Sequence, residues 1–387
     1  MEEWKTYKLS EIGTIVGGAT PSTKVAENYD GDIPWITPKD LSNFSGRFIE
    51  HGERNITQKG FDSCSCQMLP KNSVLFSSRA PIGYVAIAAV PLCTNQGFKS
   101  VVPNEEIVDP RFLYYLLKFN KDRIAEMGSG TTFMEVSGGV MKNVEVSLPE
   151  LMVQEHIADV LSSIDEKIEL NNRINHNLEK QIQECFDSMI VSDNGLGYCQ
   201  IADYVDVNPK RSIGKKVLAK CIDMSYLSTT GPFPSGWETK GYNGGMKFMN
   251  GDTIMARITP CLENGKVAFV NFLDDGEVAF GSTEYIVLHS KEGVAPEFTY
   301  FLARNRNFVD YATKNMNGSS GRQRVSGDTI EKYMIPVIDS PSLDEFSSFA
   351  APAMKVIRNN SFESRSLAST RDTLLPLLLS ENPQLRK

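Results

Sequence analysis

Two segments of the chain carry apolar residues at alternating spacings of three and four positions. Residues 150–190 contain neither glycine nor proline, and residues 341–380 contain no glycine. An average spacing of 3.5 over more than four heptads is typical of a coiled-coil seam and predicts a long helix in each segment. The first seam comprises Leu161, Ile164, Ile168, Asn171, Asn175, Leu178, Ile182, Cys185 and Met189. The second comprises Phe346, Ala350, Ala353, Ile357, Asn360, Ser364, Leu367, Arg371, Leu374 and Leu378.

The polar interruptions of the two seams predict how the helices pair. If the helices run antiparallel and paired residue numbers sum to 535, two polar layers coincide: Asn171 with Ser364, and Asn175 with Asn360. A buried Asn without a partner costs free energy, so matched layers favour this register over shifted ones. The apolar pairs would then be Leu161 with Leu374, Ile168 with Leu367, Leu178 with Ile357, Ile182 with Ala353, and Met189 with Phe346. Ile164 would face Arg371, which is a misfit in this register unless that arginine extends its head to solvent. The alternative is that each helix packs only on its own domain.

The chain also repeats one series of features in the same order. Each half has a strand-like run followed by an arginine, a proline and a glycine, at residues 74–85 and 253–267. A proline then opens an apolar helix, at Pro110 and at Pro296, as is common at the first helical position. A small polar loop follows, leads into Val-Ser-Gly, and precedes a short β-like run and the long helix. The offset between the halves drifts from 178 to about 189, as expected of insertions in loops between retained elements.

The repeat and the seams together predict an α+β fold. We expect two similar globular α/β domains, separated by two long helices that form an antiparallel coiled coil. The expected boundaries are 1–149 for the first domain, 150–194 for the central helix, 195–340 for the second domain and 341–387 for the C-terminal helix.

Composition and charge narrow the class of protein. The chain is 41% hydrophobic and 23% charged, which is typical of a globular protein and not of a disordered one. The formal net charge is −8, but residues 149–194 alone carry ten acidic and three basic residues. Each predicted domain is therefore close to neutral and could present a local basic face, whereas the acidic helix should avoid phosphates.

The location of the protein follows from what the sequence lacks. No run of 18 apolar residues predicts a membrane span, and the polar start at Met1 does not resemble a signal peptide. We therefore expect a cytoplasmic protein that binds no membrane and keeps its seven cysteines reduced.

No pattern predicts a metal, a cofactor or a catalytic centre. The cysteines and the four histidines do not show the spacings of zinc ligands. The glycine-rich segment 17–24 lacks the second glycine of a phosphate-binding loop and carries a proline where a backbone donor is needed. We expect no cofactor and no metal.

The chain resembles the specificity subunit of type I restriction-modification systems over essentially its full length. The resemblance rests on several short motifs and on their order, which is repeated in the second half. They are the opening segment 4–12, the strand 32–37, the turn 78–83, the segment 95–98, the helix entry 148–154 and residues 164–168 within the helix. The second half departs from this pattern in its turn, residues 257–260, and in its helix entry, which lacks the glutamine.

The resemblance implies a non-catalytic partner of other subunits. Its two target-recognition domains would each read one half of a split site in double-stranded DNA. Its helices would hold the domains apart and bind two methyltransferase subunits, and motor-nuclease subunits would join that core. The complex would methylate adenine at N6 and cleave DNA with ATP.

Arginines beside proline turns and small polar loops are the candidates for DNA contact, because they combine phosphate-binding and base-reading groups. We treat Arg79 and Arg257 as equivalent in the two halves; alternatively they are buried arginines that bond loop carbonyls. The remaining candidates are Lys39, Asn95, Gln96, Thr131, Thr132, Ser319, Ser320, Arg322, Gln323 and Arg324. For the loop 319–324 the alternative interpretation is an ordinary solvated turn.

Two other classes of function compete with this hypothesis. A stand-alone nuclease would need a carboxylate cluster with lysine, and a stand-alone methyltransferase would need a glycine-rich cofactor loop; neither pattern occurs. A coiled-coil scaffold that binds only proteins would share the helices but would not bind DNA.

Overall fold

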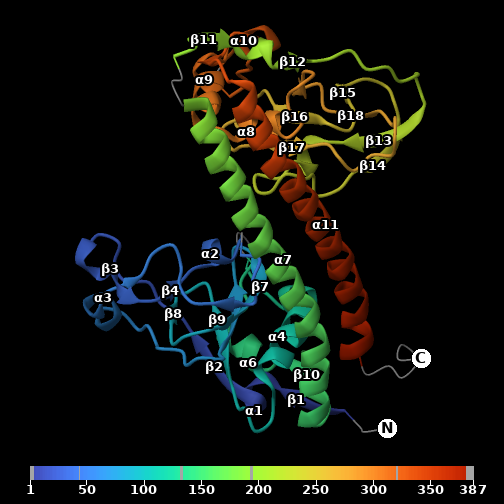
Figure 1. The fold of residues 1–387 in the computed structure, drawn as a ribbon. Coiled ribbons are helices and arrows are strands. Elements are labelled where there is room, and N and C mark those ends of the chain that lie inside the picture. The colour runs from blue at the N-terminus through green and yellow to red at the C-terminus, as the bar shows by residue number, and fades with distance from the viewer. Residues whose placement is uncertain (1–3, 43, 131–133, 192–194, 320, 381–387) are drawn as a thin grey trace. The chain divides into compact units, whose positions relative to one another are not determined.

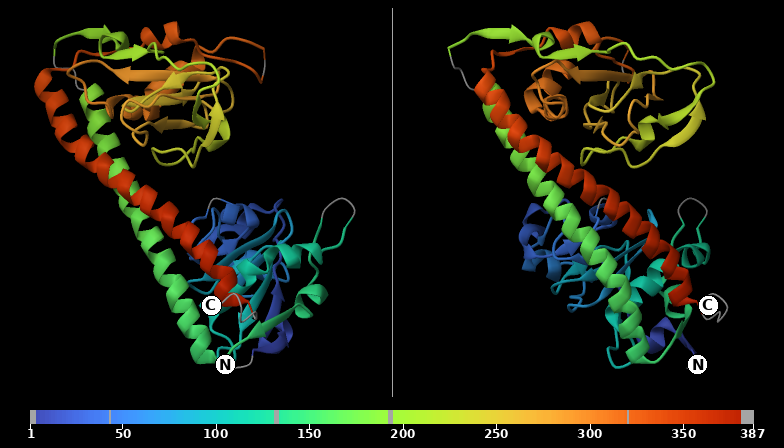
Figure 2. Two further views of the ribbon diagram at one scale, coloured as in Figure 1. Left: turned by 90° about the vertical axis from the view of Figure 1, so that its right-hand side faces the viewer. Right: turned by 45° about the vertical axis from the view of Figure 1, so that its right-hand side comes forward.

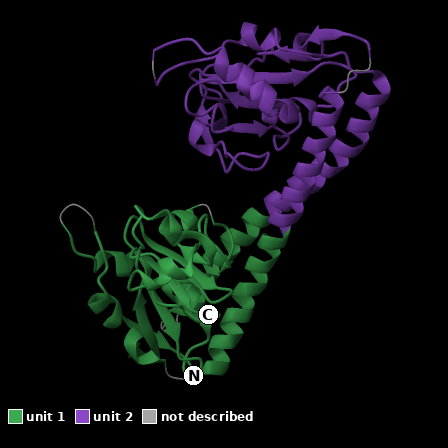
Figure 3. Cartoon of the chain, turned by 90° about the vertical axis from the view of Figure 1, so that its left-hand side faces the viewer, with its two compact units in different colours: residues 1–170, 364–387 green, residues 171–363 purple. Residues whose placement is uncertain are grey.

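The computed structural model describes residues 4–42, 44–130, 134–191, 195–319 and 321–380. The chain divides into two compact units, residues 1–170 with 364–387 and residues 171–363 (Figure 3). Two long helices, α7 (Leu151–Val191) and α11 (Ser340–Leu379), each contribute to both units (Figure 1). Neither these helices nor any shorter one in the described residues is long and apolar enough to cross a membrane.

Unit 1 combines a five-stranded sheet with short helices. Its strands are β1 (Lys5–Lys8), β2 (Gly13–Gly17), β3 (Tyr29–Ile33), β4 (Trp35–Ile36), β5 (Phe48–Ile49), β6 (Val74–Ser78), β7 (Ile82–Ala88), β8 (Cys93–Thr94), β9 (Lys99–Pro103) and β10 (Glu145–Leu148). Its helices are α1 (Leu9–Ile12), α2 (Pro38–Ser42), α3 (Gln58–Asp62), α4 (Pro110–Phe119), α5 (Lys121–Glu126) and α6 (Gly138–Lys142).

Unit 2 is built from the same kinds of element. Its strands are β11 (Tyr198–Gln200), β12 (Val205–Val207), β13 (Leu218–Ile222), β14 (Glu238–Gly241), β15 (Lys247–Phe248), β16 (Asp252–Ala256), β17 (Val267–Phe269), β18 (Ala279–Gly281), β19 (Tyr285–Ser290) and β20 (Met334–Pro336). Its helices are α8 (Phe298–Arg304), α9 (Arg306–Lys314) and α10 (Gly327–Glu331).

The sheets of the two units repeat one topology. The strand order β2-β9-β6-β7 in unit 1 matches β12-β19-β16-β17 in unit 2, and β5 extends the first sheet by one strand. An antiparallel pair precedes each long helix, β1 with β10 and β11 with β20. A parallel pair also recurs, β4 with β8 and β13 with β18. The chain therefore contains two copies of one mixed α/β domain, as the repeated motifs predict.

Local sequence explains where the helices begin. The Asp109 side chain accepts hydrogen bonds from the backbone N–H groups of Arg111 and Phe112, and Pro110 occupies the first turn of α4. These groups satisfy or remove donors that a helix start leaves unpaired. Ser137 and Ser326 cap α6 and α10 in the same way, which explains why Val-Ser-Gly occurs in both halves.

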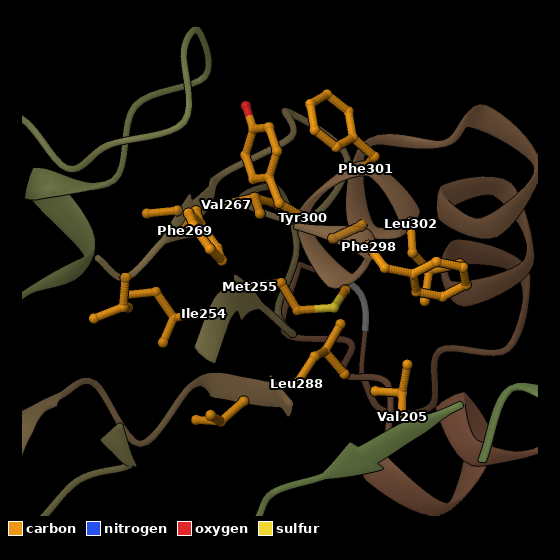
Figure 4. Packing of buried hydrophobic residues seen from close by; sticks show 14 of the residues in the cluster. Val205, Ile254, Met255, Val267, Phe269, Leu288, Phe298, Tyr300, Phe301 and Leu302 are labelled. Atoms are coloured by element: carbon orange, nitrogen blue, oxygen red, sulfur yellow. The ribbon is translucent and has the colours of Figure 1, made fainter. Parts of the chain in front are cut away.

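The core of each unit includes side chains from both long helices. In unit 2, Ile182 of α7 and Ile357 of α11 belong to the same buried cluster as Ile254, Phe298 and Leu288. Figure 4 shows how the sheet and α8 residues of this cluster pack together. In unit 1, Leu161 and Leu379 join the cluster around Phe112. The alternative in which each helix packs only on its own domain is therefore wrong.

Within each unit the two helices lie side by side and run in opposite directions (Figure 2). In unit 2, the Asn360 side-chain amide donates to the Asn175 Oδ1 at 3.0 Å, and Asn175 donates to the Ser361 hydroxyl at 3.2 Å. Asn171 is buried and donates to Glu363 at 2.8 Å. These polar contacts satisfy amide groups that would otherwise be costly inside a seam.

The remaining seam residues take positions in the two cores or beside them. Leu178 packs against the core of unit 2 and Leu374 against that of unit 1, whereas Ile168 and Leu367 are half-buried. Ser364 is buried. Its pairing with Asn171 remains a prediction.

Arg371 does not escape the misfit by reaching into solvent. Its guanidinium lies 2.6 Å from the carboxylate of Asp165, whose side chain is 6% exposed, and it also contacts Asp372. The Tyr115 hydroxyl donates to the other Asp165 oxygen at 2.7 Å. A buried carboxylate needs such partners, because an isolated charge in an apolar core is very costly.

Loss of the arginine should therefore destabilise unit 1. We predict that Arg371→Met lowers the free energy of unfolding by about 3 kcal/mol, because Asp165 then remains buried without its cation. Adding Asp165→Asn should restore part of the loss, since the amide carries no charge and its oxygen can still accept from Tyr115. Chemical denaturation measures both effects.

The exposed Lys355→Met on the same helix is the control, with an expected change within about 0.5 kcal/mol. An Arg371→Met variant as stable as this control would show that the buried pair is not stabilising.

Candidate nucleic-acid interface

Three separate segments of unit 1 meet at the turn between β6 and β7, which contains the cis Ala80–Pro81 bond. The Ser78 N–H donates to the Gly97 carbonyl at 2.7 Å, and the Val136 N–H donates to the Ser78 carbonyl at 2.9 Å. Arg79 forms a bridge with Glu135, which itself pairs with Ser129. The turn, the segment after β8 and the loop before α6 are therefore joined by backbone hydrogen bonds.

Unit 2 joins the corresponding three segments with the same pattern of bonds. The Arg257 N–H donates to the Glu284 carbonyl, and the Val325 N–H donates to the Arg257 carbonyl, both at 3.0 Å. Arg324 pairs with Asn317 and bridges to Ile258. The turn again contains a cis bond, Thr259–Pro260. We call these segments the three-loop surface: residues 79–82, 95–97, 129–130 and 134–135 in unit 1, and residues 258–261, 282–284, 317–319 and 321–324 in unit 2.

These bonds correct the predicted equivalence of Arg79 and Arg257. Arg257 corresponds to Ser78. The Ser78 N–H donates to the segment before β9, and the Arg257 N–H donates to the segment before β19. The carbonyl of each residue accepts from the valine of Val-Ser-Gly in its own unit. Arg79 matches Ile258, because each bridges the residue before that valine. The two arginines are thus one position apart, and neighbouring positions on an extended strand point to opposite faces.

Arg79 and Lys99 share one carboxylate in unit 1. Glu135 lies 3.8 Å from the Arg79 guanidinium and 3.4 Å from the Lys99 amine. The Arg79 side chain is 36% exposed, whereas that of Lys99 is 16% exposed. Arg79 is thus a partly exposed cation at the surface, held by a weak, long ion pair, and a phosphate could compete for it.

In unit 2 the position that corresponds to Glu135 carries a positive charge. Arg324 takes the place of Glu135 and donates three hydrogen bonds to the Glu284 carboxylate, at 2.7–3.0 Å. These bonds hold the pKa of Glu284 below its ordinary value, and the positive charge of Arg257 adds to that effect. Arg324 is therefore engaged within the protein, so it positions the loop and is not a free phosphate ligand.

The other candidates occupy different environments. The Asn95 side chain accepts from the Gly97 N–H at 2.8 Å, so it shapes its own turn, and the Gln96 side chain is exposed and accepts from Thr20. Lys39 is exposed and forms an ion pair with Glu53 at 2.6 Å. Ser319 and Arg322 are exposed, and the Gln323 backbone is bonded to Thr259. Thr131, Thr132 and Ser320 lie outside the described residues.

The charged partners Lys99, Glu135 and Glu284 were not predicted. The residue directly before Val-Ser-Gly is charged in both halves, as Glu135 and as Arg324. This shared feature is a sequence signal that could have pointed to Glu135. No such signal marks Lys99 or Glu284. In the part of the chain that the structure describes, no three His, Cys, Asp or Glu side chains are grouped to hold a metal ion.

The chain is similar in sequence to known DNA specificity domains and subunits. Residues 1–180 match the sequence model of the type I restriction modification DNA specificity domain. The MjaIX specificity subunit of Methanocaldococcus jannaschii, from a type I restriction enzyme, is 34% identical over 339 residues, covering 87% of this chain and 69% of that subunit. The EcoR124I/EcoR124II specificity subunit of Escherichia coli is 29% identical over 188 residues, covering 47% of this chain and 44% of that one. The chain belongs to the family of type I restriction enzyme specificity subunits.

A solved structure shares the fold over nearly its whole length. The crystal structure of the type I restriction-modification system S subunit from M. genitalium superposes with a TM-score of 0.64 at 15% identity. The match covers 98% of this chain and 97% of that one. The predicted fold of two similar α/β domains with two long helices is confirmed.

The Glu284–Arg324 pair gives a prediction with a defined pH dependence. Because the folded-state pKa of Glu284 lies below its ordinary value of 4.5, the pair stabilises the fold above that pH. Its contribution declines as the pH falls from 4.5 through the folded-state pKa. Glu284→Gln should therefore cost up to about 1 kcal/mol at neutral pH, a small value because both side chains are partly exposed.

Thermal unfolding of the variant and the native chain at neutral and acidic pH measures this difference. Glu292→Gln serves as the control, since Glu292 is exposed and has no ion pair among the described residues. A Glu284→Gln effect that stays constant on acidification would contradict the assignment of the ion pair.

Proposed function

We propose that this chain is the non-catalytic, DNA-reading subunit of a type I restriction-modification complex. Each domain would contact one half of a split site in double-stranded DNA through its three-loop surface. The two domains would correspond to residues 1–149 and 195–340. The complex would act in the cytoplasm on the DNA found there.

One observation carries this proposal: the same three-loop surface is built twice, on one backbone pattern, with different side chains. The Glu135 position of unit 1 is Arg324 in unit 2, and the Arg79 position is Ile258. Because the two units share one scheme of backbone hydrogen bonds, each surface would lie against a duplex in a similar way. The different side chains would then select different bases, since sequence is read by side chains at base edges.

Charge on the three-loop surfaces supports contact with phosphates. Arg322 is exposed and has no ion pair among the described residues, and Arg79 is partly exposed. Lys39, Asn95, Gln96, Ser319 and Gln323 are the further candidates for contact with the duplex. Phosphate contacts of this kind supply most of the affinity and position the protein on the duplex.

The long helices would serve the partner proteins. Helix α7 carries most of the excess negative charge of the chain, so DNA should not bind along it, whereas basic protein surfaces could. We propose that the helices bind two methyltransferase subunits and that motor-nuclease subunits join that complex. Adenine methylation and cleavage would then be the work of those partners.

Arg322 gives a direct test of phosphate contact. We predict that Arg322→Gln weakens DNA binding by the complex and reduces the slope of log affinity against log salt by about one. Lys355→Gln, on helix α11, should leave the slope unchanged. Binding titrations at several salt concentrations measure both. A slope that is equal in the two variants would exclude a phosphate contact at Arg322.

Helix length gives a test of how the two half-sites are spaced. Seven residues inserted in register into both helices lengthen each by about 10 Å, since a helix rises 1.5 Å per residue. If the helices set the distance between the domains, the preferred spacer should lengthen by about three base pairs, at roughly 3.4 Å each. Selection from DNA with randomised spacers measures this preference. An unchanged spacer in a folded, DNA-binding variant would refute the role of the helices as a ruler.

A further inference from the structure

A cavity of about 350 Å³ in unit 1 is lined by an excess of basic side chains. Its wall includes four cations, Arg47, Lys118, Lys121 and Arg371, but only two carboxylates, Asp165 and Glu169. The cavity lies beside Gly83 at the start of β7 and reaches α4, α5 and both long helices. A volume of this size can hold a small polyatomic ion together with waters.

Both carboxylates of the wall are already engaged. The Arg47 side chain, which is 4% exposed, donates to Glu169 at 3.0 Å and contacts Glu166 at 3.4 Å. Asp165 accepts from Arg371 at 2.6 Å and from Tyr115 at 2.7 Å. These pairs fix the two guanidinium groups, which also contact Glu166 and Asp372 outside the cavity wall.

Neither lysine of the wall forms an ion pair of its own in the described part of the chain. The Lys118 amine donates to the Tyr114 hydroxyl at 3.3 Å and has no ion pair among the described residues. Burial lowers the pKa of Lys118 and the charge of Arg371 lowers it further, and together they outweigh the opposite effect of the Asp165 and Asp372 carboxylates. Lys121 is exposed at the edge of the cavity, and it too has no ion pair in the described part of the chain. A partly desolvated amine without a carboxylate in direct contact is unfavourable, and an oxyanion bound to it would relieve that cost.

We propose that this cavity binds a phosphate group, with Lys118 and Lys121 as its principal ligands. The tetrahedral oxygens of phosphate can accept from both amines and from the Tyr114 hydroxyl, which surround the same space. The phosphate could be free inorganic phosphate or a backbone phosphate of bound DNA. None of the residues that line the cavity belongs to the three-loop surface, although Gly83 directly follows Ile82 of that surface.

Titration calorimetry of the full chain with inorganic phosphate, in chloride buffer of matched ionic strength, tests the free ion. The native chain should show saturable binding at one site. Lys118→Met should weaken that binding at least about tenfold, as expected for loss of a charge-assisted hydrogen bond. Lys121→Met, at the exposed edge, should weaken it without disturbing the fold. Lys142→Met is the matched control, because Lys142 is exposed on α6 and does not line the cavity.

Duplex DNA provides the second arm. If the ligand is a backbone phosphate, Lys118→Met should reduce the salt slope of DNA binding by about one, and Lys142→Met should not. Saturable phosphate binding without a slope change would identify free phosphate as the ligand. The proposal is overturned if phosphate does not bind and the slope is unchanged, or if Lys142→Met has the same effect as Lys118→Met. Normal DNA binding in that case would leave the proposed function intact.

Discussion

Burial of both long helices in both domain cores is the constraint on which the rest of the structure depends. Leu161 and Leu379 complete the core of unit 1, and Ile182 and Ile357 complete that of unit 2. Each such side chain contributes about 1.5–3 kcal/mol when it is fully buried. Neither domain can therefore release a helix without exposing its core. The helices are thus structural parts of the domains as well as connections between them.

The long helices and the duplicated domain could be predicted because their signals are periodic or repeated. The seam spacing, the helix start at Pro110 and the repeated Val-Ser-Gly all act within a few residues, so local sequence is sufficient to reveal them. The buried Asp165–Arg371 pair was missed because a seam pattern considers only the positions that face the partner helix. Asp165 lies one residue beside the seam, where its partners Arg371 and Tyr115 come from distant parts of the chain.

The candidate site could be predicted only in outline. Proline turns and polar loops identified the segments, but the register of the second half was displaced by one residue because an arginine was used as the marker. The backbone bonds show that Arg257 matches Ser78. Ion pairs such as Glu284–Arg324 join residues 40 positions apart and leave no trace in local sequence. The segments of the three-loop surface could therefore be located from the sequence. The ion pairs of its side chains could be assigned only from the three-dimensional structure.

The two domains thus share one pattern of backbone hydrogen bonds and differ in the charged side chains that it positions. Such an arrangement suits a protein that must read two unlike half-sites with one mode of docking. Sequencing of modified bases in the DNA of cells that carry this chain with its methyltransferase partner tests that claim most directly. The account predicts methylated adenines in a motif of two specific, unlike parts separated by a fixed number of unspecified bases. A continuous motif, or methylation without any motif, would contradict it.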